Sequence, residues 1–305
     1  MKRLFTLLLI SFAALSFEMI DEKLDDFIGK NDSSVTTIAN NQIWYTSTDG
    51  EIVEPRNEWY NNYADAHTTF GVNIVSNTYV DGKGVIEFDG NVTTIGDSAF
   101  YNCSSLTSVT IPDSVTTIGY EAFAWCRSLT SLTIPDSVTT IGAAALYVCS
   151  SLTSVTIPDS ITTIGKGAFA YCSSLHEFNG KFASEDGRCL IIDGTLNSFA
   201  PVGLTEYTIP DSVTAIGYAA FACCDSLTSV TIPDSVTTIG DHAFYNCSSL
   251  TSVYCKATTP PAGDDYMFSY NAAGRKIYVP MESVEAYKSA SYWSSYSDYI
   301  EGYNF

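Results

Sequence analysis

Basic residues are scarce in this sequence. Fourteen lysine and arginine residues stand against 34 aspartate and glutamate residues, so the formal net charge is −20 at pH 7. Proteins bind nucleic acids by neutralising phosphates with lysine and arginine, and anionic membrane surfaces attract the same residues. The charge balance therefore argues against both nucleic acid and an anionic membrane as partners.

Histidine is also rare, with three residues in the chain. His67, His176 and His242 occupy unrelated positions and lack the spacings that metal sites use. The sequence contains no glycine-rich phosphate loop, and no motif places a base beside a serine or cysteine nucleophile. We therefore predict a non-enzymatic protein with no catalytic residue, no cofactor and no metal ligand.

Hydrophobic runs long enough to span a membrane are missing as well. The one candidate, from Leu4 to Phe17, is shorter than the ~20 residues that a spanning helix needs. It follows Lys2-Arg3 and includes Ala14-Leu15-Ser16, with small residues at the spacing of a signal-peptidase site. We expect residues 1–17 to be a cleaved signal peptide, with an uncleaved anchor as the alternative. Because no cysteine stands near that site, we expect an exported protein, secreted or at the cell surface or in the periplasm, that is not a lipoprotein.

What the sequence has in abundance is one repeated string. LTSVTIPDSVTTIG stands at 106–119 and returns unchanged at 227–240, with three near copies between them. Equivalent apolar residues recur every 23 positions, except that Ile161 and Val213 are 52 apart, which leaves one unit six residues longer than the others. A period of 23 lies within the range of leucine-rich repeats and outside those of helical or propeller arrays.

Each copy of the string predicts one turn of a coil. The apolar residues of L-x-x-V-x-I point inward from a short strand, and Pro112 ends that strand because it has no N–H to donate. A second short extended segment leads to Gly119, where we expect a backbone angle that other residues resist. Phe123 then packs a helical or irregular turn into the core, and Cys126 closes the unit. One unit cannot bury its own apolar face, so the copies are expected to stack.

The predicted fold is therefore a leucine-rich-repeat solenoid, a β-rich α/β, curved right-handed coil of about 23-residue repeats, with a cap at each end. Runs such as Gln42–Tyr45 and Val72–Val75 suggest irregular strands in an N-terminal cap over residues 18–85. The repeats cover 86–254, with the longer, irregular unit at about 181–203, and residues 255–305 form a C-terminal cap. In that cap we expect a last strand at Lys276–Val279, followed by a short helix at Ser283–Ala290.

The repeat also carries a family resemblance. The string C-x-x-L-x-x-V-x-I-P-x-S-V-x-x-I-G-x-x-A-F, complete from Cys103 to Phe123, resembles the BspA-like leucine-rich repeat family of exported surface antigens. The segments FASEDGRCLIIDGTLNSFAP, from Phe182, and IYVPMESVEAYKSA, from Ile277, resemble parts of exported members. The resemblance implies a solenoid used for adhesion or protein binding, without naming a ligand.

Most of the nine cysteines follow the repeat. Six form one column, at Cys103, Cys126, Cys149, Cys172, Cys224 and Cys247. Stacked units would bring neighbouring cysteines into disulfide range, but parallel Cα–Cβ vectors give poor bridge geometry, so we predict a reduced, buried ladder rather than a disulfide or metal array. One bridge among the remaining three, Cys189, Cys223 and Cys255, is left open.

The positions that differ between copies indicate where a ligand would bind. The two residues after each repeat glycine and the residue before each column cysteine vary too widely for core positions, so we expect them at the surface. From these columns, and from three residues that interrupt an otherwise uniform Ser/Thr strand face, we select as candidate ligand-binding residues Tyr120, Glu121, Trp125, Lys166, Tyr171, Tyr218, Glu177 and Glu206. The alternative is neutral drift, because solvent-facing turns tolerate change.

These observations predict an exported leucine-rich-repeat protein that mediates protein–protein or cell-surface binding, in the manner of an adhesin and without catalysis. The expected partner is a protein or glycan on a cell surface or in extracellular matrix. We expect no nucleic-acid partner, no integral membrane segment after signal cleavage, and a monomer. The alternative is a structural or spacer solenoid of the cell envelope without a specific ligand.

Overall fold

The computed structural model describes residues 38–55 and 69–305. The expected signal peptide, and with it residues 18–37 and 56–68 of the expected N-terminal cap, lie outside the described residues. The described residues belong to one unit that begins at Ile38. No helix among them is long and apolar enough to cross a membrane.

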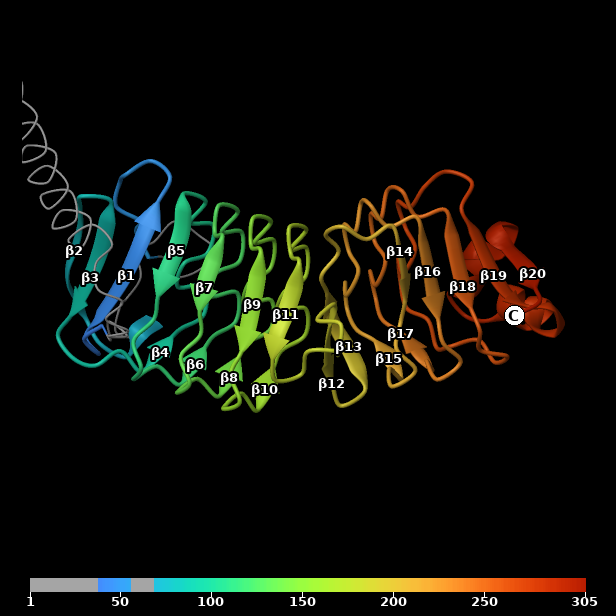
Figure 1. Cartoon of the computed structure of the whole chain (residues 1–305), viewed down its shortest axis with the longest axis horizontal. Helices are drawn as coiled ribbons and strands as arrows, with labels where there is room; N and C mark the ends of the chain where they lie inside the picture. The colour runs from blue at the N-terminus through green and yellow to red at the C-terminus, as the bar shows by residue number, and fades with distance from the viewer. Residues whose placement is uncertain (1–37, 56–68) are drawn as a thin grey trace, which may run out of the picture. The chain divides into compact units, whose positions relative to one another are not determined.

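Each repeat forms one turn of a β-solenoid, and each turn has three sides (Figure 1). The first side, here the strand side, carries the longer strands. Val109 lies opposite Leu132 in a parallel pair, which is the register that a 23-residue period requires. The strands of this side are β5 (Leu106–Thr110), β7 (Ser131–Thr133), β9 (Ser154–Ile157), β11 (Glu177–Gly180), β14 (Glu206–Thr208), β16 (Ser229–Ile232), β18 (Ser252–Cys255), β19 (Lys276–Pro280) and β20 (Ile300–Tyr303).

The second side consists of two ladders of short parallel strands, and all of these strands except β4 and β13 follow a Pro-Asp-Ser turn. The serine of this turn recurs because its hydroxyl donates a hydrogen bond to a carbonyl of the preceding turn. Ser137 Oγ lies 2.7 Å from Val115 O, and Ser160 Oγ lies 2.7 Å from Val138 O. The strands are β4 (Thr94–Ile95), β6 (Thr117–Ile118), β8 (Thr140–Ile141), β10 (Thr163–Ile164), β13 (Thr195–Phe199), β15 (Ala215–Ile216) and β17 (Thr238–Ile239).

The third side, here the turn side, runs from each repeat glycine to the column cysteine. Alternate N–H groups donate to the next turn, as in Phe100 N to Ala122 O at 2.7 Å and Phe123 N to Ala145 O at 2.7 Å. The glycine is needed here for close approach, since a Cβ built on Gly142 would lie 2.5 Å from the carbonyl carbon of Gly119. The expectation of an unusual backbone angle at Gly119 is therefore wrong, because Gly119 is not among the glycines with a positive φ.

The core is filled by the repeated apolar columns. Phenylalanine rings stack from turn to turn, with Phe100 and Phe123 centroids 5.2 Å apart and Phe221 and Phe244 centroids 4.7 Å apart. The column cysteines are buried, and the thiols of Cys126, Cys149, Cys172 and Cys247 donate to carbonyls of the preceding turn, for example Cys149 Sγ to Phe123 O at 3.2 Å. The structure shows no disulfide among the nine cysteines, all of which lie in the described ranges; eight are buried, and Cys223, outside the column, is half-buried.

Antiparallel strands precede the first repeat. β1 (Gln42–Ser47) pairs antiparallel with β5 on one side and with β3 (Lys83–Phe88) on the other, and β2 (Ile74–Val80) pairs with β3. The strand expected at residues 72–75 therefore begins two residues later. Whether these strands act as a cap stays a prediction.

At the C-terminal end a short helical segment lies between β19 and β20. It consists of η1 (Met281–Ser283), α3 (Val284–Ser289) and η2 (Trp293–Tyr299). Tyr287 and Trp293 are fully buried, and α3 matches the expected helix. The expectation that Lys276–Val279 is the last strand is wrong, because β20 pairs parallel with β19 after the helix.

Compared with a regular unit, the irregular unit has extra residues before the second side and fewer residues on the turn side. It inserts β12 (Cys189–Ile192), which forms an antiparallel hairpin with β13, and β13 takes a place on the second side because Leu196 pairs with Ile216. From Gly180 to Leu196 this unit has nine residues more than the span from Ile157 to Ile164 in the preceding turn. The turn side is correspondingly reduced, because Asn197 and Leu204 are seven positions apart where Gly217 and Leu227 are ten apart.

The six-residue surplus seen in the sequence is thus the net of a nine-residue gain and a three-residue loss. Within the described ranges, no backbone hydrogen bond joins the turn at 165–172 to the turn at 217–224, although all the other neighbouring turns are so joined. The turn side is therefore interrupted at one place, and the candidate site lies there.

Candidate functional site

The turn side holds its side chains on a backbone that enters the left-handed region twice in every turn. Glu121 and Trp125 have φ of 51° and 65°, and Ala219 and Cys223 have 51° and 58°. Non-glycine residues adopt such angles only when surrounding contacts hold them. Here the hydrogen bonds between turns supply those contacts, so the backbone is constant while the side chains differ.

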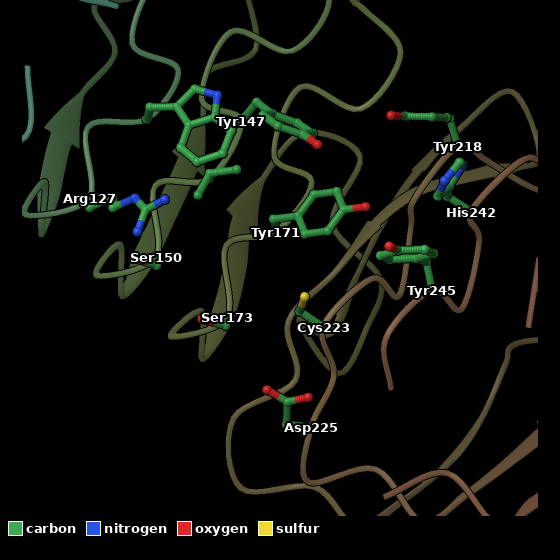
Figure 2. Close-up of a pocket in the computed structure, with 12 residues that line it drawn as sticks. Arg127, Tyr147, Ser150, Tyr171, Ser173, Tyr218, Cys223, Asp225, His242 and Tyr245 are labelled. Carbon is green, nitrogen blue, oxygen red and sulfur yellow. The ribbon is translucent and has the colours of Figure 1, made fainter. Parts of the chain in front are cut away.

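The interruption opens one pocket, here the Tyr171 pocket, with a volume of about 530 Å³. Figure 2 shows Tyr147 and Tyr171 on turns before the irregular unit and Tyr218, His242 and Tyr245 on turns after it. Cys223 lies between these groups, and its Sγ accepts a hydrogen bond from Asn246 Nδ2 at 3.3 Å. The remaining lining residues are Trp125, Arg127, Val148, Ser150, Ser173 and Asp225.

A second pocket, here the Glu121 pocket, has a volume of about 500 Å³. It opens because one turn carries Ala143-Ala144 where the neighbouring turns carry Tyr120-Glu121 and Lys166-Gly167. Its lining residues are Tyr101, Tyr120, Glu121, Trp125, Ala143, Ala144, Tyr147, Lys166 and Tyr218. Both pockets include Trp125, Tyr147 and Tyr218, so we treat them together as the aromatic groove.

Aromatic rings of the groove contact one another along the stacked turns. Ring centroids of Trp125 and Tyr147 are 6.1 Å apart, and those of Tyr147 and Tyr171 are 5.0 Å apart in an edge-to-face arrangement. The tyrosines pack over a floor of small buried residues, Ala170, Ala219 and Ala222. Pairs of this kind add to the stability that burial provides and hold the rings in place before any ligand arrives.

Two cations of the chain already lie over rings of the groove. Arg127 Cζ is 4.9 Å from the centroid of the Trp125 ring, and Lys166 Nζ is 5.0 Å from that of Tyr218. A cation within about 6 Å of a ring centroid is attracted by the negative face of the π-system. The groove therefore shows, with its own residues, the kind of group that its rings attract.

Three phenols of the groove, those of Tyr120, Tyr147 and Tyr171, stay neutral at ordinary pH. Burial raises the pKa of Tyr147 to about 12 and also raises the pKa of Tyr171. The hydrogen bond from Tyr120 to the Glu121 carboxylate raises the pKa of Tyr120 to about 12. Neutral phenols both donate and accept hydrogen bonds, so the groove combines apolar ring faces with polar edges.

Six of the eight candidate residues line the aromatic groove, namely Tyr120, Glu121, Trp125, Lys166, Tyr171 and Tyr218. The other two, Glu177 on β11 and Glu206 on β14, are exposed on the strand side and do not join them. The expected surface exposure is wrong for Glu121, which is 8% exposed.

Several lining residues were missed by sequence reasoning. Tyr147 and Tyr245 stand directly after the buried apolar residue of their turns, in a column that reads Tyr, Ala, Tyr, Ala, Ala and Tyr in the six regular units. Its variation is as wide as that of the columns that were used, so this signal was available. Arg127 and Asp225 follow the column cysteine and are exposed.

The chemistry available in the groove is that of binding. The described residues include no group of three His, Cys, Asp or Glu that could hold a metal ion. What the groove offers is ring faces, neutral hydroxyls and a few carboxylates at fixed positions. Such surfaces attract ligands through stacking, cation–π contact and hydrogen bonds.

Comparison with known proteins identifies the repeat. The family model described as "BspA type Leucine rich repeat region" matches six copies at residues 83–184 and 195–300. A comparison with curated proteins finds no match.

Solved structures with similar chains come from several bacteria. They include the T. pallidum leucine rich repeat protein, at 29% identity over 58% of this chain and 70% of that one, with a TM-score of 0.35. A leucine-rich repeat protein from Bacteroides ovatus has 25% identity over 68% of this chain and 63% of its own, with a TM-score of 0.43. A leucine rich cell surface protein from Faecalibacterium prausnitzii has 24% identity over 70% and 77%, with a TM-score of 0.39.

Proposed function

The chain belongs to the BspA-type leucine-rich repeat family, and from that premise we propose that it is a non-catalytic, adhesin-like binding protein that holds a macromolecular ligand in the aromatic groove. The proposal includes export, as expected from residues 1–17, and a partner on a cell surface or in extracellular matrix. The observation that carries it is the pair of adjoining pockets that six turns of the solenoid line with tyrosine and tryptophan.

Three features support binding over drift. The pockets lie where one unit differs from its neighbours, in sequence at Ala143-Ala144 and in length at the shortened turn of the irregular unit. The rings that line them are partly exposed yet packed against one another, so a ligand meets a preorganised surface. Tyr and Trp are also the residues that most often dominate binding energy at interfaces, because they bury much area at low entropic cost.

Affinity capture from extracellular matrix, host-surface and microbial-surface extracts tests the proposal when it is run with matched variants. The groove variant is Trp125→Ala/Tyr171→Ala, and the control is Tyr254→Ala/Tyr278→Ala, which removes a stacked pair of rings (4.8 Å between centroids) from the strand side. We expect one reproducible partner, retained by the control and lost by the groove variant, with thermal melts showing that both variants fold.

Two results would contradict the proposal. A partner that both variants retain would place the binding site elsewhere. Failure of the wild-type chain to capture any partner from all three extracts would favour the alternative function, a structural or spacer solenoid without a specific ligand. Cell fractionation checks export separately, because an intracellular full-length chain would remove the surface partner from consideration.

A further inference from the structure

The floor of the Glu121 pocket contains a carboxylate oxygen that lacks a partner. Glu121 is 8% exposed, and its Oε2 is buried without a hydrogen-bond donor among the described residues. A buried carboxylate oxygen without a donor loses its hydration and gains nothing in return. The unmet requirement is for an N–H or O–H group that enters the pocket from outside.

The described residues do not provide that donor. Lys166 lines the same pocket, but its ammonium lies over the Tyr218 ring, and the described ion pairs do not include one between Lys166 and Glu121. Ala143 and Ala144, opposite Glu121, carry no polar side-chain atom. Tyr120 donates to the Glu121 carboxylate, and Oε2 remains unpaired in spite of that contact.

The walls around this oxygen are aromatic. Tyr120, Trp125, Tyr147 and Tyr218 line the pocket together with Glu121. Ring faces attract cations, and burial beside a carboxylate strengthens the attraction because water screens it less. A neutral donor would satisfy Oε2 but would leave the charge of the carboxylate uncompensated, whereas an ammonium or guanidinium group would satisfy both.

We propose that the Glu121 pocket receives a lysine or arginine side chain presented by the partner protein. The inference rests on the proposed function and specifies the chemistry of its ligand. The net charge of −20 complements a basic segment and would draw it toward the chain from a distance. Net negative charge alone would attract a cation to any face of the protein. The inference is more specific, because it places the cation in the Glu121 pocket.

The test titrates the full chain with a short capped peptide of alternating arginine and glycine, and with the same peptide carrying citrulline, the uncharged isostere of arginine. Calorimetry or chemical-shift perturbation measures the dissociation constants. We expect the arginine peptide to bind roughly tenfold more tightly than the citrulline peptide, and the Glu121→Gln variant to lose most of that preference.

The matched control is Glu185→Gln, which removes the same charge from an exposed loop position outside both pockets. We expect it to change the dissociation constant less than about twofold, because one distant surface charge is largely screened. A second variant, Ala143→Phe, fills the pocket from the opposite wall and leaves Glu121 in place. We expect it to weaken the arginine peptide as strongly as Glu121→Gln does, which keeps the test valid if one variant fails to fold.

Equal effects of Glu121→Gln and Glu185→Gln would overturn the inference, because binding would then follow net charge alone. Absence of arginine-peptide binding by the wild-type chain would also overturn it. The proposed function has its own readout, loss of partner capture in the groove variant. If that loss occurs while the arginine peptide does not bind, or while a neutral oligosaccharide probe binds in the groove instead, the function stands and the basic ligand is wrong.

Discussion

Tyr218 places its ring directly against Gly167, across the part of the turn side that the irregular unit leaves short. A Cβ built on Gly167 would lie 2.9 Å from Tyr218 Cδ1. The Lys166 ammonium lies over the same ring, and Tyr147 and Tyr218 line both pockets together. The contact therefore joins turns on either side of the interruption where backbone hydrogen bonds do not.

This contact predicts that Gly167→Ala destabilises the chain. The equivalent positions Ala144 and Ala219 hold alanine at φ of 52° and 51°, so the backbone angle alone does not require glycine. We expect a loss of about 1–3 kcal/mol in the free energy of unfolding, because the Tyr218 ring must shift. Urea denaturation measures the loss.

The matched control for Gly167→Ala is Gly203→Ala, where φ is also positive (81°) but nothing lies within 4 Å of the new Cβ. We expect about 1 kcal/mol there, the cost of the angle alone. In a Tyr218→Ala background the two substitutions should become similar. A persistent difference in that background would show that the cost at Gly167 has another origin.

The thiol ladder leads to a second stability prediction. Cys149 is fully buried and donates to Phe123 O, so Cys149→Ala removes one of the two hydrogen bonds that this carbonyl accepts and opens a small cavity. We expect a loss of about 1–2 kcal/mol by chemical denaturation. Cys223→Ala, at a half-exposed thiol outside the ladder, should cost less. Equal costs would mean that the thiol–carbonyl bonds contribute little.

Much of the fold was predictable because the 23-residue period determines which residues of neighbouring turns lie opposite one another. The stretch from Leu106 to Cys126 contains the inward apolar columns, the strand-ending proline and the serine and cysteine that bond to the preceding turn. Each of these residues acts locally or on the adjacent turn, so a period of 23 is sufficient to place it. The reason for Gly119 was misjudged because close approach between turns is not visible within one unit.

The site was less predictable because it depends on differences between turns. A surplus of six residues in the sequence does not reveal that three residues are missing from the turn side. Nor does variation at Glu121 indicate burial, although this residue is 8% exposed. Tyr147 was missed although its column varies, because it directly follows a core residue, Leu146.

Alkaline pH should destabilise the chain through the same buried groups. Burial raises the pKa of Cys172 and of Cys189 to about 12 from 9.0, and that of Tyr147 to about 12 from 10.0. The unfolded chain then releases these protons at lower pH than the folded chain, so stability is fully present below about pH 9 and falls as the pH rises toward 12. Urea midpoints measured from pH 7 to 11 should decline only above about pH 9.

The variant Cys172→Ala provides the control for the pH series. It should unfold at a lower urea concentration at pH 7 but lose less stability between pH 9 and 11, since one of the raised groups is gone. A parallel decline in both proteins would assign the pH dependence to groups other than this thiol.

The hydrogen bonds of Arg188 are expected to stabilise the irregular unit. Its Nη1 donates to the carbonyl oxygens of His176 at 2.7 Å and Val202 at 2.9 Å, on the two sides of the hairpin. Arg188→Leu keeps much of the aliphatic stem and removes these bonds, so we expect a loss of about 2–3 kcal/mol. Arg188→Lys should recover part of it, because one ammonium cannot reproduce the planar guanidinium.

Hydrogen exchange locates the part of the chain that Arg188→Leu destabilises. The amide of Val202, which donates to Leu175 O at 3.1 Å, should exchange faster in Arg188→Leu, while the amide of Phe123, in a regular turn, should keep its protection against local opening. If both amides lose protection equally, the irregular unit unfolds only together with the whole solenoid. If neither changes, the carbonyl contacts of Arg188 do not hold the hairpin in place, and the shape of the aromatic groove does not depend on them.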